Sequence, residues 1–537
     1  MNTPSTNSTN NKNQKYVIAI DVGNSSTKVG LVNQEGEVLA FASGRYETLF
    51  LPNGGAEQVP LEWWQVILSG VKQVIKESGV VPTQIVAIGT TSMWAVTVAV
   101  DKQGEPLMNA VSWMDSRGGK YNAELVKGFP RIQGYGAGKL YSWLKIIGIP
   151  PFLEGNDSLA HILFIKNELP DIYRHTYKFL EPMDFINMRL TGKANATRNS
   201  NTASLLIDSR KKGTSDYAPW ALKQTGIDRA KLPDLLPVEG IVSNLSSSIA
   251  GEWGITTDTV VISSATDNSV APIGCGAIAD YEAVAVLGTS GMLVFHCPNK
   301  KVDLIHMLGT IPSSLNNRYI IFGDTGNTGK VIDSFLKNLV YGQDGFSIDS
   351  LPENVYDRLN QAAAQIPAGS EGILFLPWYN SASLAPTADR FLRGGFINLT
   401  NNTTRNHLAR AMLEGITYNW RWLKEAAEAF TKQKFLYWRV TGGGALSDVW
   451  VQIMADVIGI PMYQLENPSN NTLLGIAFLA FNRMGMMSLD EIPDKIRIKR
   501  VFEPNPINKE VYDHMYSQFR KCTKQLKPVF HTLNKPA

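Results

Sequence analysis

Residues 17–40 read VIAIDVGNSSTKVGLVNQEGEVLA and decide the fold. Apolar residues alternate with small or polar ones, and this alternation breaks at a turn and then resumes. The pattern predicts two half-buried strands joined as a hairpin. Gly23 allows the backbone of this turn to approach a ligand closely, and Ser25 and Ser26 add hydroxyl and amide donors. Asp21 ends the first strand, where its carboxylate could hold Mg²⁺ or a metal-bound water beside substrate phosphates. The segment favours a phosphate-binding turn, with an ordinary hairpin as the alternative.

The same plan recurs in the second half of the chain, where residues 283–297 read AVAVLGTSGMLVFHC. A short apolar strand leads to the turn of Gly288, Thr289, Ser290 and Gly291, and a second apolar strand follows. A chain of 537 residues is too long for one core, so we expect two or more domains. The two hairpins therefore predict two related halves that face a shared cleft, with nucleotide phosphates between them.

The composition excludes several classes of function. Hydrophobic residues make up 44% of the chain, which is enough for a large core, and the net charge is only +3. This balance provides no basic surface for nucleic acid. The segment KIRIKR at 495–500 alternates basic and apolar residues, so we interpret it as an edge strand. Three widely spaced cysteines exclude a disulfide framework and fit a reducing compartment.

The N-terminal sequence MNTPSTNSTNNKNQK has no apolar core and predicts a disordered tail over residues 1–15. A secretory signal needs a continuous apolar stretch of roughly seven residues or more, and none precedes Tyr16. The stretch at 85–100, IVAIGTTSMWAVTVAV, is interrupted by polar residues and predicts a strand, a loop and a strand rather than a membrane span. We therefore expect a cytoplasmic protein with neither a membrane nor a nucleic acid as partner.

Strands and helices alternate along the chain, which is typical of an α/β fold. A helix is predicted over 61–79, and residues 150–240 form a more irregular helical region that we interpret as an insertion shaping a substrate pocket. Helical periodicity returns at 405–430 and again from Asn508 to the end of the chain. We place the boundary near residue 280. The predicted units are the tail (1–15), an N-terminal domain (16–280) and a C-terminal domain (281–537).

Asp267 is the strongest candidate for a catalytic residue. It follows the apolar strand VVISSAT and precedes a helix, which places it at the carboxyl edge of a sheet, where ligands of open α/β folds bind. A carboxylate there can accept the proton of a substrate hydroxyl that attacks a γ-phosphorus. The alternative is a helix N-cap, because Asp is favoured directly before a helix.

Two further groups of residues suggest binding surfaces. Gly442, Gly443 and Gly444 follow a strand and leave one face free of side chains, so that adenosine can lie against the backbone; packing or flexibility is the alternative. The polar loop that contains Asn471 is a candidate for the same pocket. The segments SMW (92–94) and WMDSR (113–117) combine aromatic, acidic and basic side chains that suit a polyol, although tryptophan is more often a core residue.

The segment GDTGNTGK at 323–330 resembles a Walker loop, but its spacing fails. Asp324 stands where the first glycine is required, and Val331 follows the lysine. We interpret the segment as another loop at the cleft.

Four motifs occur in order along the chain: DVGNSSTK (21–28), DN (267–268), LGTS (287–290) and GGGA (442–445). They resemble the phosphate-1, catalytic-base, phosphate-2 and adenosine motifs of the FGGY family of carbohydrate kinases, whose superfamily includes actin, hexokinase and the heat-shock chaperone ATPases. The resemblance extends from Tyr16 to the C-terminal helix. It implies an α/β fold in which two ribonuclease H-like domains flank an ATP cleft.

The resemblance also implies a role for each matching residue. Asp267 would be the general base, and Asp21 would orient Mg²⁺ and its waters. The residues implied to bind the sugar are Met93, Trp94, Asp115, Arg117 and Asn268. The residues implied to bind ATP are Gly23, Asn24, Ser25, Ser26, Lys28, Gly288, Thr289, Gly442, Gly443, Gly444 and Asn471.

The segments SMW and WMDSR are most similar to those of xylulokinases, which implies ATP-dependent conversion of D-xylulose to D-xylulose 5-phosphate. Two residues depart from the family pattern: Asn24 replaces the usual Thr, and Trp94 replaces the His that xylulokinases commonly carry after Met. Ribulose, gluconate, glycerol and erythritol stay open as acceptors. A catalytically weak sugar-sensing homologue is the alternative from another class, and a chaperone ATPase is a third. A homodimer is one expectation, and the oligomeric state stays open.

Overall fold

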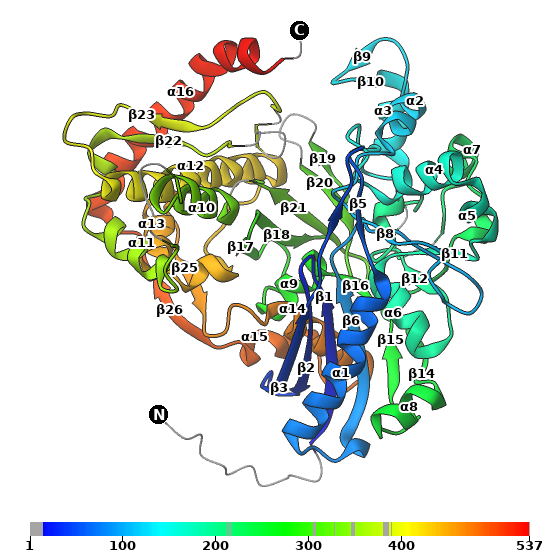
Figure 1. Ribbon diagram of the computed structural model, residues 1–537. Helices are drawn as coiled ribbons and strands as arrows, with labels where there is room; N and C mark the ends of the chain where they lie inside the picture. The colour runs from blue at the N-terminus through cyan, green and yellow to red at the C-terminus, as the bar shows by residue number, and fades with distance from the viewer. Residues whose placement is uncertain are drawn as a thin grey trace.

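The computed structural model describes residues 14–210, 212–213, 216–303, 308–326, 328–344, 350–379, 386–387 and 389–535. The predicted disordered tail over residues 1–15 lies outside the described residues, except for Gln14 and Lys15. Two mixed β-sheets, one in each half of the chain, form the centres of two lobes (Figure 1). Among the described helices, none combines the length and the apolar character needed to cross a membrane.

The N-terminal sheet has the strand order β14-β15-β6-β1-β2-β3, with β16 added beside β6. Its strands are β1 (Tyr16–Val22), β2 (Ser26–Asn33), β3 (Val38–Arg45), β6 (Ile85–Ser92), β14 (Ile241–Asn244), β15 (Val260–Ile262) and β16 (Ala265–Thr266). β1 and β2 pair antiparallel and form the predicted first hairpin, whereas β6 runs parallel to β1, β15 and β16. The carboxyl ends of β1, β6 and β16 therefore share one edge of the sheet.

Helices from distant parts of the sequence cover the two faces of this sheet. α1 (Pro60–Ser78) packs on β2 and β3, with Pro60 at its start and the left-handed Gly79 ending it, as is common for helices. α9 (Asp267–Gly274) and α14 (Asn471–Arg483) pack on each other, and α14 packs on β1 and β6. Figure 1 shows α14, in orange, beside the blue strands of the other half of the chain. The C-terminal half thus completes the core of the N-terminal sheet, and the division near residue 280 stays a prediction.

The C-terminal sheet has the strand order β19-β20-β21-β18-β17-β24-β25-β26. Its strands are β17 (Ala283–Leu287), β18 (Gly291–Cys297), β19 (Val302–Asp303), β20 (Leu308–Pro312), β21 (Tyr319–Asp324), β24 (Trp438–Thr441), β25 (Met462–Leu465) and β26 (Ile498–Phe502). β17 and β18 form the second predicted hairpin. β26 is an edge strand, as predicted for KIRIKR, but it begins only at Ile498, and Lys495 instead ends the short helix α15 (Ile492–Lys495).

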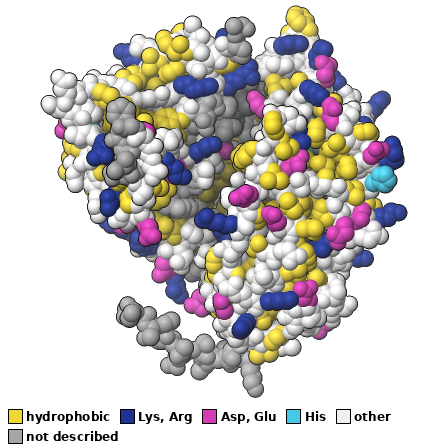
Figure 2. Space-filling view, in the orientation of Figure 1, with side chains coloured by type: hydrophobic (Ala, Val, Ile, Leu, Met, Phe, Trp, Pro, Cys, Tyr) yellow, Lys and Arg dark blue, Asp and Glu magenta, His cyan; other side chains and the backbone are white. Residues whose placement is uncertain are grey.

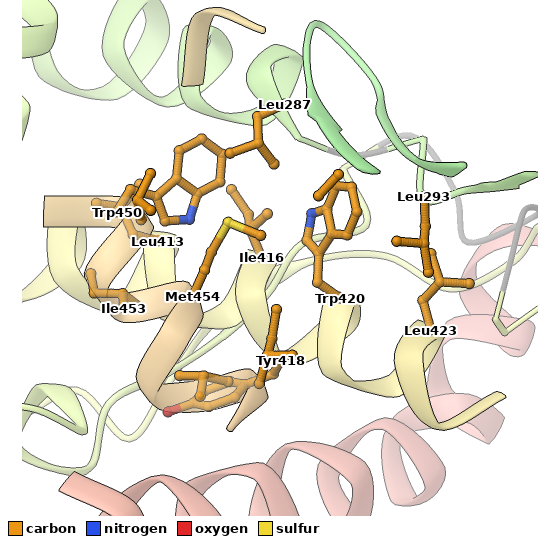
Figure 3. Packing of buried hydrophobic residues seen from close by; sticks show 14 of the residues in the cluster. Leu287, Leu293, Leu413, Ile416, Tyr418, Trp420, Leu423, Trp450, Ile453 and Met454 are labelled. Carbon is orange, nitrogen blue, oxygen red and sulfur yellow. The ribbon is translucent and has the colours of Figure 1, made fainter. Parts of the chain in front are cut away.

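Three helices, α12 (Arg405–Thr431), α13 (Asp448–Ile458) and α16 (Lys509–Asn534), contribute to the largest hydrophobic core, which lies against the C-terminal sheet. On α12, Leu413, Ile416, Trp420 and Leu423 recur at spacings of three and four residues, so they share one face and are buried together. Figure 3 shows Ile416, Trp420 and the Trp450 ring near Leu287. Since Leu287 directly precedes the second glycine turn, this core fixes where that turn begins.

The region between β6 and β15 of the N-terminal sheet is mostly helical, as predicted for residues 150–240. Its helices are α2 (Gly119–Leu125), α3 (Ala137–Ile146), α4 (Ser158–Glu168), α5 (Pro170–His175), α6 (Pro182–Thr191), α7 (Pro219–Thr225) and α8 (Ser247–Trp253). Leu159 to Ile165 of α4 are all buried, which explains why this helix is apolar on every side. The region covers the right-hand side of the molecule in Figure 1.

Candidate active site

Three strand ends bring the candidate residues of the N-terminal half to one edge. In the parallel register, Asp21 of β1 lies beside Thr91 of β6, and Thr266 of β16 lies beside Ser92. Met93 directly follows β6, and Asp267 directly follows β16. The carboxyl edge of a parallel arrangement is where open α/β sheets bind ligands. Residues separated by more than 240 positions in the sequence therefore meet at this edge.

Asp267 is the first residue of α9, and Thr266 occupies the N-cap position, so the N-cap alternative for Asp267 is wrong. Its Oδ1 accepts a hydrogen bond of 2.7 Å from the backbone N–H of Asn268. Burial and, to a smaller extent, the negative charge of Asp21 together raise the pKa of Asp267 to about 7, while backbone hydrogen bonds and Lys28 oppose the rise. A carboxyl group with a pKa close to physiological pH can both take up and release a proton, which suits a general base.

Asp21 is buried at the end of β1 and contacts both halves of the chain. Its Oδ2 accepts a hydrogen bond of 2.7 Å from Oγ1 of Thr472 and lies 3.8 Å from Nζ of Lys28. Thr472 belongs to the first turn of α14, so the helix that fills the N-terminal core also places a hydroxyl on this carboxylate. The predicted nucleotide residue Asn471 precedes it and is buried beside Cys275, with which its side chain shares a hydrogen bond.

Side chains from distant segments support the first glycine turn, residues 23–25. The hydroxyl of Tyr46 donates to the carbonyl of Gly23, and Nε2 of Gln58 donates to the carbonyl of Asn24 at 2.7 Å. The indole Nε1 of Trp113 donates to Oδ1 of Asn24 at 3.1 Å. Because the Asn24 oxygen is occupied, its amide N–H groups are what the side chain offers to a phosphate.

The turn Gly288–Gly291 and the triple glycine lie at one edge of the C-terminal sheet. β17 and β24 are parallel, with Val286 beside Thr441. The backbone N–H groups of Gly329 and Lys330 donate to the carbonyls of Gly288 and Thr289 at 3.1 and 3.0 Å. These donors begin α10 (Gly329–Phe335). The second turn is thus fixed by backbone groups of a neighbouring helix.

Different local surroundings explain why each of the three positions 442–444 is a glycine. A Cβ on Gly442 would lie 2.8 Å from the carbonyl oxygen of Leu287, and one on Gly444 would lie 2.6 Å from the Trp450 ring. A Cβ on Gly443 would meet nothing within 4 Å, and this residue is exposed. Packing therefore accounts for Gly442 and Gly444, and only Gly443 presents an open backbone surface to a ligand.

Three of the predicted sugar residues lie along the N-terminal edge. Met93 is 5% exposed, and its backbone N–H donates to the carbonyl of Val22 at 2.9 Å. Trp94 is partly exposed and packs edge-on against Phe322 of β21, with ring centroids 5.5 Å apart. Oδ1 of Asn268 accepts from the Thr266 hydroxyl at 2.7 Å, but its Nδ2 is buried and donates to no described residue. A buried polar group without a partner calls for an explanation, and this one adjoins Asp267.

Direct hydrogen bonds also join the N-terminal and C-terminal halves. Ser269 of α9 and Ser314, which follows β20, exchange hydrogen bonds of 2.9 Å, and Nδ2 of Asn199 donates to the carbonyl of Pro312 at 2.8 Å. Figure 2 shows the surface hollowed between the two lobes, with Lys and Arg side chains beside the hollow. The N-terminal edge thus carries a carboxyl group with a pKa near 7 and a buried amide without a partner among the described residues, and each sheet carries one glycine turn.

Two family sequence models match the chain: the N-terminal domain of the FGGY family of carbohydrate kinases over residues 16–274, and the C-terminal domain of the same family over residues 283–484. The chain belongs to the FGGY family of carbohydrate kinases. The predicted family, the enzyme class and the two-domain α/β fold are thereby confirmed.

Individual relatives of this FGGY kinase differ in the substrates that their names give. The chain is 28% identical to a xylulose kinase of Bacillus subtilis (strain 168), over 97% of this chain and 100% of the relative. A gluconate kinase structure from Lactobacillus acidophilus superposes with a TM-score of 0.84 at 22% identity, covering 97% of this chain and 100% of the other. A Plasmodium falciparum glycerol kinase structure with ADP superposes with a TM-score of 0.80 at 20% identity, covering 95% and 98%. The fold is therefore shared across several acceptors.

Asp115 and Arg117 of this FGGY kinase are occupied by protein contacts. Nη2 of Arg117 forms ion pairs of 2.7 Å with both Glu57 and Asp115, and its guanidinium lies over the Phe164 ring, 4.3 Å from the centroid. Asp115 is 1% exposed and also accepts from the backbone N–H of Ala56 at 2.9 Å. Through these contacts, Asp115 and Arg117 hold in place the segment that carries the half-exposed Trp113. This geometry does not support their predicted direct contact with the sugar.

Two polar contacts of the site were not predicted from the sequence. Thr472 bonds Asp21, and it immediately follows the predicted Asn471. Glu57 pairs with Arg117 from 60 residues away. Glu57 lies in a short strand, and nothing in the local sequence indicates that Arg117 is its partner. Thr472 stands at the start of an apolar helix and can be recognised as a first-turn residue.

Proposed function

We propose that this kinase transfers the γ-phosphoryl group of ATP to a hydroxyl of a neutral sugar or polyol, with D-xylulose as the first acceptor to test. The observation that carries the proposal is the pair Asp267 and Asn268: a carboxyl group with a pKa of about 7 beside a buried amide donor that has no partner among the described residues. A base and an orienting donor on adjacent residues are what a hydroxyl nucleophile requires.

The reaction follows from where the polar groups lie. The acceptor hydroxyl binds between Asp267 and Nδ2 of Asn268, and its oxygen attacks the γ-phosphorus as its proton passes to Asp267. The bond from the γ-phosphorus to the bridging oxygen breaks, and ADP leaves with that electron pair. Phosphoryl transfer depends mainly on position and on charge stabilisation, and the glycine turns at 23–25 and 288–291 supply backbone N–H groups to the phosphates. Gly443 offers the open surface for adenosine.

Asp21 fits the role of a magnesium-binding residue. Mg²⁺ is commonly held by one or two carboxylates together with waters and substrate phosphates. Asp21 provides one carboxylate at the edge that carries the first turn, and no group of three or more His, Cys, Asp or Glu side chains elsewhere in the described chain offers a competing metal site. Bound there, the ion would neutralise negative charge on the phosphates. Lys28 would add a positive charge from the neighbouring strand.

A sugar-sensing protein without efficient transfer is the second candidate. The departures Asn24 and Trp94 favour it, because both change contacts that family members use. The buried Nδ2 of Asn268 suits either function, and a carboxyl group with a pKa near neutrality at the same sheet edge as the first turn favours proton transfer. We therefore place catalysis first.

A panel of acceptors separates the two candidates. The protein is incubated with ATP and Mg²⁺ and with D-xylulose, D-ribulose, glycerol, erythritol or gluconate, and ADP release and thermal stability are measured in parallel. Catalysis predicts that at least one neutral acceptor increases ADP release about tenfold or more over ATP alone, since turnover of the correct acceptor requires its bound geometry. A sugar that raises the melting temperature without releasing ADP would instead support the sensor.

A further inference from the structure

The loop GDTGNTGK is a motif that the proposed chemistry leaves unused, and it begins at the edge of the C-terminal sheet that carries the second turn. Asp324 is the last residue of β21 and pairs in register with Met292 of β18, directly after Gly291 of the second turn. The backbone N–H of Thr325 donates to the carbonyl of Gly291 at 2.7 Å. Asp324 therefore lies at the same sheet edge as the second turn.

The face of the sheet on which Asp324 lies follows from its neighbours. A Cβ on Gly323 would lie 2.6 Å from Leu423, so residue 323 faces α12. Side chains alternate along a strand, so Phe322 and Asp324 both point away from α12. Phe322 and Val286 accordingly pack against the same small cluster, and Val286 also packs against the cluster that contains Cys275, at the end of α9. This is the face that receives the helix beginning at Asp267.

Phe322 of the C-terminal half contacts Trp94 of the N-terminal half. Contacts with buried residues hold the turn that carries Trp94. Ala95 has a φ of +60°, a left-handed conformation that is uncommon for alanine. Oε2 of the buried Glu181 accepts from the backbone N–H of Val96 at 3.0 Å. Strained residues persist where surrounding contacts determine them, and they concentrate at functional sites. The surrounding contacts therefore hold Trp94 in position against Phe322.

Asp324 has bonding capacity that no described residue uses. Its Oδ1 accepts from the backbone N–H of Gly326 at 2.7 Å, and its Oδ2 has no hydrogen-bond or ion-pair partner among the described residues. Burial raises the pKa of Asp324 to about 6, so the group is mainly ionised above neutral pH. An ionised carboxylate accepts hydrogen bonds and repels other anions.

We propose that Phe322 and Asp324 form a second wall of the acceptor site, contributed by the C-terminal half, and that this wall selects neutral polyhydroxylated acceptors over anionic sugar acids. The inference rests on the proposed function, because it concerns the acceptor of that reaction. A hydroxyl of the acceptor, away from the one that is phosphorylated, donates to Oδ2 of Asp324. The C–H edges of the carbon chain lie against Trp94 and Phe322.

This wall explains how one fold distinguishes acceptors of similar size. A sugar acid such as gluconate would bring its carboxylate toward Asp324, and two like charges at contact distance oppose binding. A neutral ketopentose or tetritol gains a hydrogen bond to a charged acceptor instead, which is stronger than a bond between neutral groups. Selection therefore depends on the charge of residue 324, whereas the aromatic pair selects for shape.

The test compares the wild-type protein with Asp324→Asn, Phe322→Ala and the control Asp490→Asn, which removes an exposed negative charge. Isothermal titration measures the Kd of D-xylulose, erythritol and gluconate, and ADP release measures turnover. In Asp324→Asn the Kd of the best neutral acceptor should rise about tenfold or more, consistent with the loss of a charged hydrogen bond. The preference for neutral acceptors over gluconate should fall by at least as much, and the KM for ATP should stay within about twofold, since this wall contacts only the acceptor.

Phe322→Ala should weaken neutral acceptors and gluconate alike, and Asp490→Asn should change nothing. An unchanged neutral-to-gluconate preference in Asp324→Asn, or a wild-type protein that binds gluconate more tightly than every neutral acceptor, would overturn the inference. So would a change confined to the KM for ATP, since it would place Asp324 on the nucleotide side. Because Kd is measured without turnover, absence of ADP release from the wild type would refute the proposed kinase function while the binding preference still decides on the wall.

Discussion

The two glycine turns carry similar sequences but are held in place by different means. Hydrogen bonds from Tyr46, Gln58 and Trp113 reach the first turn from other segments. The second turn is fixed by backbone donors of α10 and by close packing around Gly291, where a Cβ would lie 2.2 Å from Oγ1 of Thr328. Side-chain hydrogen bonds position the first turn. The second turn is positioned by close packing, which is possible because Gly291 has no side chain.

This difference connects each turn to a different part of the cleft. Trp113 lies on the segment that the Asp115–Arg117 ion pair holds in place, so the first turn is coupled to residues 113–117. The second turn is coupled to Gly442 through Leu287 and hence to the proposed adenosine surface. Similar motifs thus need not tolerate the same substitutions.

Gly291→Ala should give the largest effect among substitutions in the turns. The added methyl group would overlap Thr328, Thr325 and the Trp420 ring, so we expect a loss of about 1–3 kcal/mol or more in the free energy of unfolding, as for other overpacked cores. Urea unfolding measures this loss. Gly288→Ala is the matched control, because its Cβ would meet only the Ser290 carbonyl at 3.4 Å. Equal stability of the two variants would remove the stated difference between the turns.

Gly444→Ala and Gly443→Ala should separate packing from nucleotide binding. The first variant overlaps Trp450 and should be destabilised by about 1–3 kcal/mol. The second should unfold like the wild type but bind ATP several-fold more weakly, since its methyl group projects into open space where we place adenosine. Calorimetric titration with ATP and thermal unfolding provide the two readouts. Wild-type ATP affinity in Gly443→Ala would argue against the adenosine surface.

The pH dependence of the reaction should respond to Asp21, on the strand that leads to the first turn, and not to the second turn. A general base acts when deprotonated, so kcat/KM should rise with pH through the Asp267 pKa of about 7. The negative charge of Asp21 raises this pKa, so Asp21→Asn should move the rise to lower pH, whatever its effect on the maximal rate. Thr289→Ala in the second turn should leave the rise in place. A shift to higher pH in Asp21→Asn would contradict the assigned electrostatics.

Tyr46→Phe should give the smallest effect. It removes the hydroxyl that donates to the carbonyl of Gly23, and a single hydrogen bond contributes about 0.5–1.5 kcal/mol to stability. We expect a loss in this range and a KM for ATP raised at most a few-fold. Thermal unfolding and initial rates measure the two quantities. If Tyr46→Phe were as damaging as Gly291→Ala, side-chain support and close packing would not differ as proposed.

Much of this fold could be predicted because its signals are local. The alternation in 17–40 and 283–297 predicted both hairpins, and the periodicity of 405–430 predicted α12 to within one residue at its C-terminal end. The course of α14 could not be predicted. An apolar helix pattern shows that a helix is buried but does not show which sheet it covers, and α14 covers the sheet of the other half.

The candidate site was predicted less completely. Asp267 and Asn268 carry their own signal, as polar residues directly after an apolar strand. Asp115 and Arg117 looked like sugar ligands because their partner Glu57 lies in a short strand of only three residues, β5 (Ala56–Gln58), far away in sequence. Whether a glycine serves packing or a ligand also depends on tertiary neighbours, as Gly442 and Gly443 demonstrate.

The central claim is that Asp267 is the base of a phosphoryl transfer whose donor is held by the two turns. Asp267→Asn retains the size of the side chain and removes its basicity. With the best acceptor of the panel, the account predicts that kcat falls about 10²–10⁴-fold while the Kd for ATP stays within about threefold of the wild type. A variant that retains more than about a tenth of the wild-type kcat, below the loss expected for a general base, would contradict the account.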